Sequence, residues 1–169
     1  MARSLAANRP LALNLDVDAV RSALGAWIDQ PHESGLAARV LAVAMATTHL
    51  GHGHDVIVPQ LLVRDTFILE LEAVADQTRS RFIEIALIVD RDDAIRAFES
   101  RSASPENQQH RDAQHLIERS GGIQELVELH DRFMDFLDTR TNAHRIRVVL
   151  GDVEGTLRLV ESAISAHRM

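Results

Sequence analysis

The 169-residue sequence contains no cysteine, and all 18 of its basic residues are arginine. Without cysteine the chain forms no disulfide and no thiolate metal site, which is compatible with a reducing compartment, and we expect a cytoplasmic protein. Without lysine the chain has no Schiff-base chemistry and no lysine general base. It also has no phosphate-binding lysine of the P-loop type.

Other absences argue against particular classes of binding partner. No apolar run approaches the about 18 residues that a membrane span needs, and the first ten residues lack the apolar segment of a secretory signal. The net charge of −7 argues against a nucleic-acid partner, because phosphate neutralisation needs clustered cations. The motifs GxxxxGK[ST], GxGxxG, HExxH and GxSxG are also missing. We therefore expect neither a membrane nor a nucleic-acid partner.

What is present is typical of a globular α/β protein. Hydrophobic residues make up 46% and charged residues 25% of the chain, and the length predicts a single domain over residues 1–169. Aliphatic runs predict strands at 11–15, 55–59, 82–89 and 145–150. Helical periodicity predicts helices at 17–28, 34–50, 64–78, 91–100, 122–138 and 154–167. Strands that are apolar throughout favour a parallel sheet covered by helices on both faces.

An acidic pair follows the first predicted strand. Asp16 and Asp18 come where that strand turns into a helix, and Asp18 and Arg21 are spaced to lie on one helix face. A carboxylate at the carboxyl end of a strand can take a proton from a substrate hydroxyl, and a nearby arginine can hold an anionic group. The alternative is that one aspartate caps the helix and Arg21 is solvated.

Several arginines lie between the third predicted strand and the end of the polar segment that follows it. Arg91 and Arg96 follow that strand, and Arg101 and Arg111 lie within residues 101–115, which we expect to form a lid-like excursion. Arginines on such a flap suit phosphate binding. Equally, they fit a solvated helix in which acidic neighbours balance the charge.

Three histidines, His49, His52 and His54, fall within six residues. Their number suggests a metal site. Two glycines mark a helix end at this point and no carboxylate motif surrounds the cluster, so we expect structural or surface roles and no metal site.

Taken together, four segments resemble the P-loop kinase-like proteins often labelled AAA family ATPases, near the zeta-toxin, chloramphenicol phosphotransferase and gluconate kinase group. They are LNLDVDAVRSALGAW, LAARVLAVAMATTHLGHGHDVIVPQLLVR, FIEIALIVDRDDAIRAFESR and RVVLGDVEGTLRLV, in order over most of the chain. The resemblance implies a three-layer P-loop NTPase-like parallel sheet. It also implies an ATP-dependent phosphotransferase that acts with Mg²⁺ on a small hydroxyl-bearing substrate.

The resemblance also implies roles for individual residues. Asp18 would be the general base toward the substrate hydroxyl, and Asp16 and Arg21 would bind the substrate. Further residues would bind the nucleotide. They are arginines before and within the lid and two residues of the loop after the last strand: Arg96, Arg101, Arg111, Gly151 and Asp152.

The chain departs from the family at one place. The family has a strand and a glycine-rich loop ending in Lys-Ser/Thr before the segment that starts at Arg9, and this sequence has neither. The missing strand is central in the family's sheet, so we expect an incomplete domain whose open strand edges promote self-association. Each unmade buried hydrogen bond costs about 1–3 kcal/mol, against a total stability of about 5–15 kcal/mol. Either the chain is an inactive part of a phosphotransferase, or it is a degenerate homologue that binds a nucleotide or a protein.

Overall fold

The computed structural model describes residues 1–103 and 122–167, of which 101–103 are described as backbone only. The chain divides into two compact units, Met1–Phe82 and Ile83–Met169. We describe each unit by itself. Most of the predicted lid-like segment, residues 104–115, lies outside the described residues.

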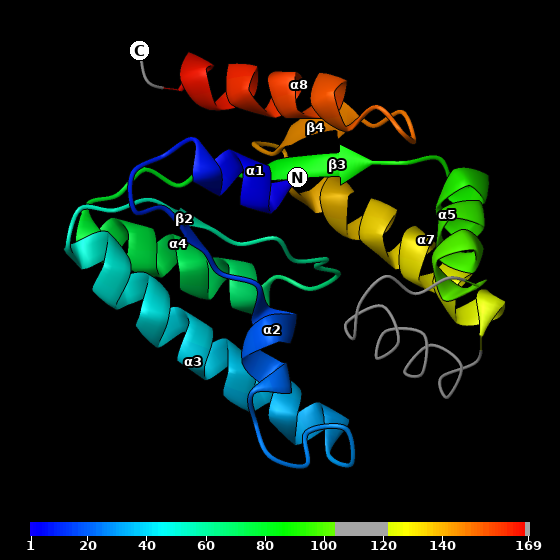
Figure 1. Cartoon of the computed structure of the whole chain (residues 1–169), viewed down its shortest axis with the longest axis horizontal. Coiled ribbons are helices and arrows are strands. Elements are labelled where there is room, and N and C mark those ends of the chain that lie inside the picture. The colour runs from blue at the N-terminus through cyan, green and yellow to red at the C-terminus, as the bar shows by residue number, and fades with distance from the viewer. Residues whose placement is uncertain (104–121, 168–169) are drawn as a thin grey trace. The chain divides into compact units, whose positions relative to one another are not determined.

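The first unit is built around a short parallel strand pair (Figure 1). Its elements are α1 (Ala2–Ala7), β1 (Leu13–Asn14), α2 (Val17–Ser22), α3 (Pro31–Gly51), β2 (Val56–Ile57) and α4 (Thr66–Thr78). Leu13 pairs with Val56, and the ladder extends through the Leu15 amide, which donates to the Ile57 carbonyl at 2.8 Å. Among the described residues, β2 has no other strand partner.

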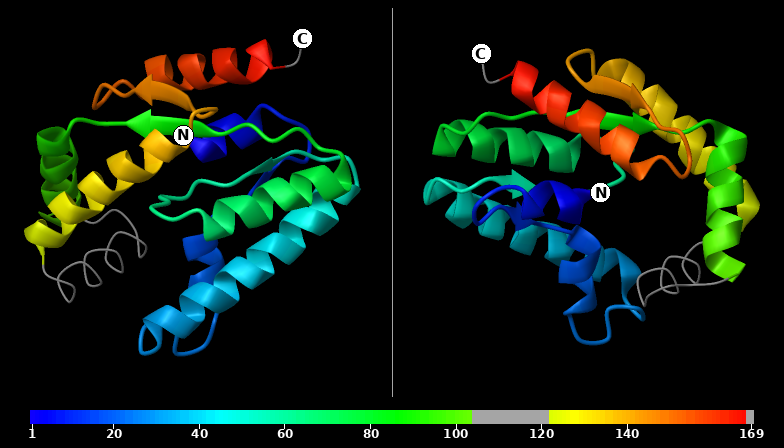
Figure 2. Two further views of the ribbon diagram at one scale, coloured as in Figure 1. Left: turned by 180° about the vertical axis from the view of Figure 1, so that it is seen from behind. Right: turned by 45° about the horizontal axis from the view of Figure 1, so that its top comes forward.

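Helix α3 packs against the rest of this unit through its smallest side chains. A fourfold spacing places Ser34, Ala38, Ala42 and Ala46 in one buried row. Helix α4 runs beside α3 in both Figure 1 and Figure 2, and the two helices are in contact. Side chains this small let neighbouring elements approach closely. The buried cluster around the three alanines also contains Leu15, Val17, Phe67 and Val74.

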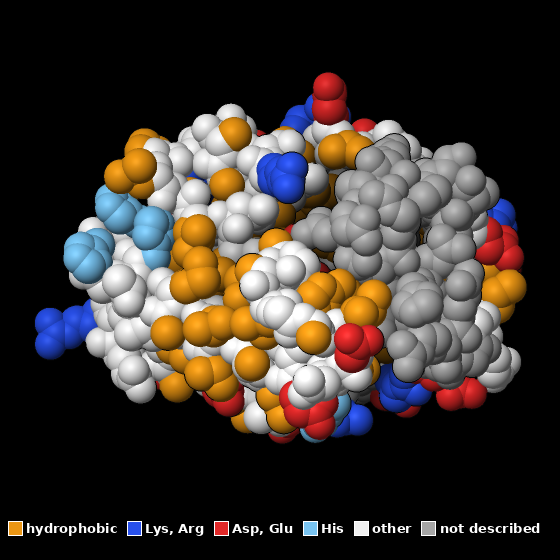
Figure 3. Space-filling view, turned by 60° about the horizontal axis from the view of Figure 1, so that its bottom comes forward, with side chains coloured by type: hydrophobic (Ala, Val, Ile, Leu, Met, Phe, Trp, Pro, Cys, Tyr) orange, Lys and Arg blue, Asp and Glu red, His pale blue; other side chains and the backbone are white. Residues whose placement is uncertain are grey.

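Helix α3 also carries apolar side chains that are exposed. Leu36, Val40, Leu41 and Met45 are exposed, and Figure 3 shows hydrophobic side chains gathered on this face of the molecule. The helix begins at Pro31, three residues earlier than the predicted start at 34, because proline suits the first turn of a helix. Apolar residues on this helix therefore extend well beyond its buried row.

The second unit has its own parallel pair. Its elements are β3 (Ile85–Ile88), α5 (Arg91–Ala103), α7 (Ile123–Thr139), β4 (His144–Arg147) and α8 (Val153–Ala166) (Figure 1). Ile85 pairs with His144 and Ile88 with Arg147. The start of β3 is tied to the end of α7 by an ion pair, in which Arg140 Nη2 lies 2.9 Å from Glu84 Oε2 and both side chains are more than four-fifths buried.

The predicted mixed α/β class with parallel strands is confirmed. The strands are shorter than predicted, and the described strands form two separate pairs instead of one sheet. A three-layer sheet therefore stays a prediction. Helix α1 was not predicted, and the helix expected over 17–28 ends at Ser22. In the described part of the chain, no helix is both long enough and apolar enough to cross a membrane.

Candidate functional site

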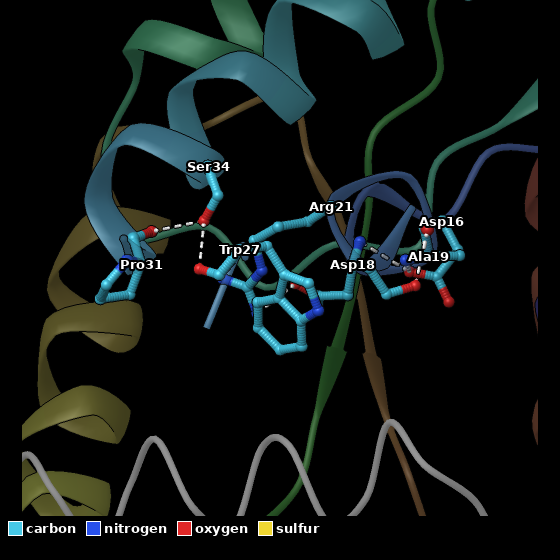
Figure 4. Close-up of polar contacts among 8 residues, drawn as sticks. Asp16, Asp18, Ala19, Arg21, Trp27, Pro31 and Ser34 are labelled. Atoms are coloured by element: carbon cyan, nitrogen blue, oxygen red, sulfur yellow. Dashed lines mark hydrogen bonds and ion pairs between the residues drawn. The ribbon is translucent and has the colours of Figure 1, made fainter. Parts of the chain in front are cut away.

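Asp16 fixes the start of α2. Its Oδ1 accepts hydrogen bonds from the backbone N–H groups of Asp18, at 3.0 Å, and Ala19, at 3.3 Å (Figure 4). This is the geometry of an N-cap, in which a side-chain oxygen satisfies amides that have no partner within the helix. The alternative that an aspartate caps this helix is therefore confirmed for Asp16. Its assignment to substrate binding stays a prediction.

Asp18 and Arg21 lie on one face of α2, as their spacing predicted, and the structure shows that they form an ion pair. Arg21 Nη2 lies 3.2 Å from Asp18 Oδ1 across one turn of α2. The two partners differ in exposure, because the Asp18 side chain is 54% exposed and that of Arg21 only 19%. A molecule arriving from solvent therefore meets the carboxylate first, with the guanidinium held behind it.

Trp27 holds the Arg21 side chain from another direction. The Arg21 Cζ atom lies 4.9 Å from the centroid of the Trp27 ring, a cation–π distance, and Figure 4 shows the indole beside the arginine. The loop carrying Trp27 is tied to α3, because the buried Ser34 hydroxyl donates to the Trp27 carbonyl at 3.0 Å. Arg21 is thus positioned by both its own helix and this loop.

The pKa of Asp18 is raised above its usual value. Partial burial is the main cause, since removing water disfavours the charged form. Arg21 lowers the pKa, Asp16 raises it, and Arg39 of α3 lowers it again. A carboxylate with a raised pKa is a stronger base, and this one is accessible to solvent.

These side chains form a cluster with defined chemical abilities. Asp18 can accept a proton, while Arg21 and Arg39 can attract an anionic group. We refer to Asp18, Arg21, Trp27 and Arg39 as the α2 cluster. Every member lies in the first unit.

Two members of the α2 cluster were not predicted. No sequence pattern pointed to either Trp27 or Arg39 as a site residue. Each is nevertheless unusual in the sequence: Trp27 is the only tryptophan, and Arg39 is the only charged residue between Glu33 and His49. What the sequence could not show is that packing of α2 on α3 brings them toward Asp18.

The residues assigned to the nucleotide lie in the second unit or outside the described residues. Arg96 is exposed and forms an ion pair with Asp93, one turn earlier in α5. The side chain of Arg101 and the whole of Arg111 lie outside the described residues. Gly151 has a positive φ of 88° in the turn before α8. Asp152 caps α8, because its Oδ1 accepts the Gly155 N–H at 2.8 Å.

Two of the histidines at the end of α3 form hydrogen bonds with backbone carbonyls. His49 Nε2 lies 2.7 Å from the Leu11 carbonyl and His52 Nδ1 lies 2.7 Å from the Thr48 carbonyl, so each of these nitrogens donates. The rings of His49 and His54 lie 5.1 Å apart. Within the described residues, no group of three or more histidine or acidic side chains is arranged to hold a metal ion.

Comparison with known proteins gives no relative of this chain, because no protein-family model, no curated protein and no solved structure matches it.

Proposed function

We propose that the first unit carries the acceptor-substrate site of a small-molecule phosphotransferase of the P-loop kinase type. Asp18 takes the proton of a substrate hydroxyl, and Arg21 binds an anionic group of the same molecule. The main support for this proposal is the ion pair between Asp18 and Arg21, which are 3.2 Å apart in the helix that follows a parallel strand. The resemblance in sequence and the parallel direction of the paired strands support the P-loop kinase-like fold, and its three-layer sheet is proposed from the resemblance alone.

The geometry suggests how a substrate would engage the site. An incoming carboxylate or phosphate competes with Asp18 for Arg21, whose guanidinium stays in place against Trp27. Asp18 then loses a contact that lowers its pKa, so its basicity rises when the substrate binds. Binding and activation of the base are thereby coupled through one arginine.

Mg²⁺–ATP fits the described residues poorly. The chain has no lysine and no GxxxxGK[ST] segment. Arg96 is paired within its own helix, and the carboxylate of Asp152 occupies the start of α8, where its negative charge opposes a phosphate. No phosphoryl-transfer step follows from these residues. We therefore propose that this chain by itself binds the acceptor and does not transfer phosphate.

The absent phosphate loop favours a second candidate function. In it the chain is a non-catalytic homologue of such kinases and acts as a nucleotide- or protein-binding module. Calorimetry of the full chain with ATP and Mg²⁺ distinguishes the two. Saturable nucleotide binding without turnover supports the module, whereas no nucleotide binding in a chain that binds an acceptor contradicts a nucleotide-binding module.

The acceptor site is tested through the single tryptophan. Titration with gluconate and with uridine monophosphate, two hydroxyl-bearing anions, should produce a saturable change in Trp27 fluorescence for at least one of them. Arg21→Gln should abolish that binding, whereas Arg64→Gln, which changes an exposed arginine of the same unit, should leave it intact. Equal binding by both variants would remove Arg21 from the site.

The open edges of the strand pairs support the predicted self-association. Among the described residues, β2 pairs only with β1, and β3 only with β4. Unpaired N–H and C=O groups on such edges can accept a strand from another copy. We propose weak, concentration-dependent association, which sedimentation velocity detects. A constant monomer mass over a hundredfold range of concentration contradicts it.

A further inference from the structure

Two histidines of the second unit meet from distant positions in the sequence. His144 begins β4 and His167 follows the last residue of α8. Their Nε2 atoms lie 3.1 Å apart, and their ring centroids 4.4 Å apart with the rings nearly perpendicular. The contact meets the geometry of a hydrogen bond between the two rings, so one of these nitrogens donates and the other accepts.

The distance between these nitrogens also suits a shared metal ion. Imidazole nitrogens bind such ions at about 2.0–2.1 Å, so two that bind one ion at square or tetrahedral angles are about 2.9–3.4 Å apart. The observed 3.1 Å falls within this range. Both side chains reach solvent at the contact, which gives an ion access.

One of the two rings is already held in the form that binds metal. His167 Nδ1 lies 3.1 Å from the Ala163 carbonyl. A carbonyl only accepts, so Nδ1 carries the proton and Nε2 has a lone pair. A backbone carbonyl on the second nitrogen is the usual support of a metal-binding histidine. His144 supplies the second lone pair once its proton moves from Nε2 to Nδ1.

We propose that His144 and His167 bind one divalent transition-metal ion through their Nε2 atoms, with solvent completing its coordination. The imidazole donors favour Cu²⁺ over Ni²⁺ and Zn²⁺. Among the described residues, no third histidine or acidic side chain joins these two histidines as a ligand. An ion held by only two protein ligands exchanges with solvent. Binding links the end of α8 to the start of β4 and so stabilises the second unit.

The test titrates the untagged full chain with CuCl₂ and follows binding by calorimetry and electron paramagnetic resonance. The chain has nine histidines, so variants are needed to identify the ligands. His144→Gln and His167→Gln should each weaken binding by about tenfold or more and remove one nitrogen from the resonance signal. His49→Gln and His52→Gln, which alter histidines of the first unit, should leave both readouts unchanged.

Thermal melting gives an independent readout. Zn²⁺ should raise the melting temperature of the wild type but not of His144→Gln or His167→Gln, and His144→Glu, which keeps a ligand, should regain part of the shift. Circular dichroism checks that each variant is folded. Absence of saturable binding, loss of binding in only one of the two glutamine variants, or loss in His49→Gln would each overturn the proposal.

Discussion

The Arg21 guanidinium lies 4.9 Å from the centre of the Trp27 ring while it forms an ion pair with Asp18 at 3.2 Å. One cation thus links helix α2 to the loop that follows it. Since Trp27 is also bound through its carbonyl to Ser34 of α3, the arginine takes part in the packing of α2 on α3. The α2 cluster is therefore a candidate binding site and also contributes to the packing of α2 on α3.

The Arg21–Trp27 contact should be measurable in a double-mutant cycle. Arg21→Gln and Trp27→Leu should show a coupling free energy of about 0.5–2 kcal/mol in urea unfolding, the range for a cation over an aromatic ring. Arg21→Lys keeps the charge and should retain part of the coupling. Additive effects of the two substitutions would show that the contact contributes nothing. Circular dichroism follows the unfolding, because Trp27→Leu removes the only tryptophan.

The Asp16 cap predicts a clear difference between two substitutions. Asp16→Ala removes an acceptor of two backbone N–H groups and should lower the free energy of unfolding by about 0.5–2 kcal/mol. Asp16→Asn keeps a capping oxygen and should lose only a small part of this. The effect matters for α2 because a helix of six residues has little other support. Equal losses in both variants would argue against a capping role.

The raised pKa of Asp18 predicts a pH dependence with a definite sign. In the pH range between the usual aspartate pKa and the raised one, the folded protein binds more protons than the unfolded chain. Stability therefore falls as the pH rises through this range, and protonation restores it. Asp18→Asn lacks this dependence, so its stability relative to wild type should increase from pH 3 to pH 7.

Urea unfolding of both proteins across that range measures the difference. The effect should be small, because the side chain is half exposed and solvent screens its charge. An Asp18→Asn variant that loses stability relative to wild type as the pH rises would show that the Arg21 contact outweighs burial. Asp29→Asn, at an exposed position in the loop after α2, is the matched control.

At the start of α8, Asp152 and Gly155 should be energetically coupled. A Cβ at position 155 would lie 2.0 Å from Asp152 Oδ2, so Gly155→Ala forces the capping carboxylate to move. In an Asp152→Ala background, Gly155→Ala should stabilise the helix by about 1 kcal/mol, because alanine is the better helix former. In the wild type the gain should be smaller or reversed. The same gain in both backgrounds would contradict the cap.

Local patterns in the sequence predicted most of the helices and the shared helix face of Asp18 and Arg21. Periodicity gave α4 and α7 to within two residues, because each of these helices has an apolar face of regular spacing. The strands were overestimated, since aliphatic runs such as 82–89 contain only four residues that pair, Ile85 to Ile88. Strand length depends on where the partner strand lies, which no local pattern records.

The candidate site was predicted less completely than the helices. The spacing of Asp18 and Arg21 within one turn is a local property, and the structure has that pair. Trp27 and Arg39 join it only through packing of α2 and its following loop on α3, so their roles depend on contacts between elements. The burial that raises the pKa of Asp18 is equally non-local.

The row of Ser34, Ala38, Ala42 and Ala46 limits how this sequence can change. Each of the three alanines is at most 1% exposed, so a larger side chain would push α3 away from its neighbours. Positions on the opposite side, such as Val40 at 69% exposure, carry no such restriction. Homologues that have diverged elsewhere should therefore keep small residues every fourth position along α3, and this pattern offers a way to recognise them.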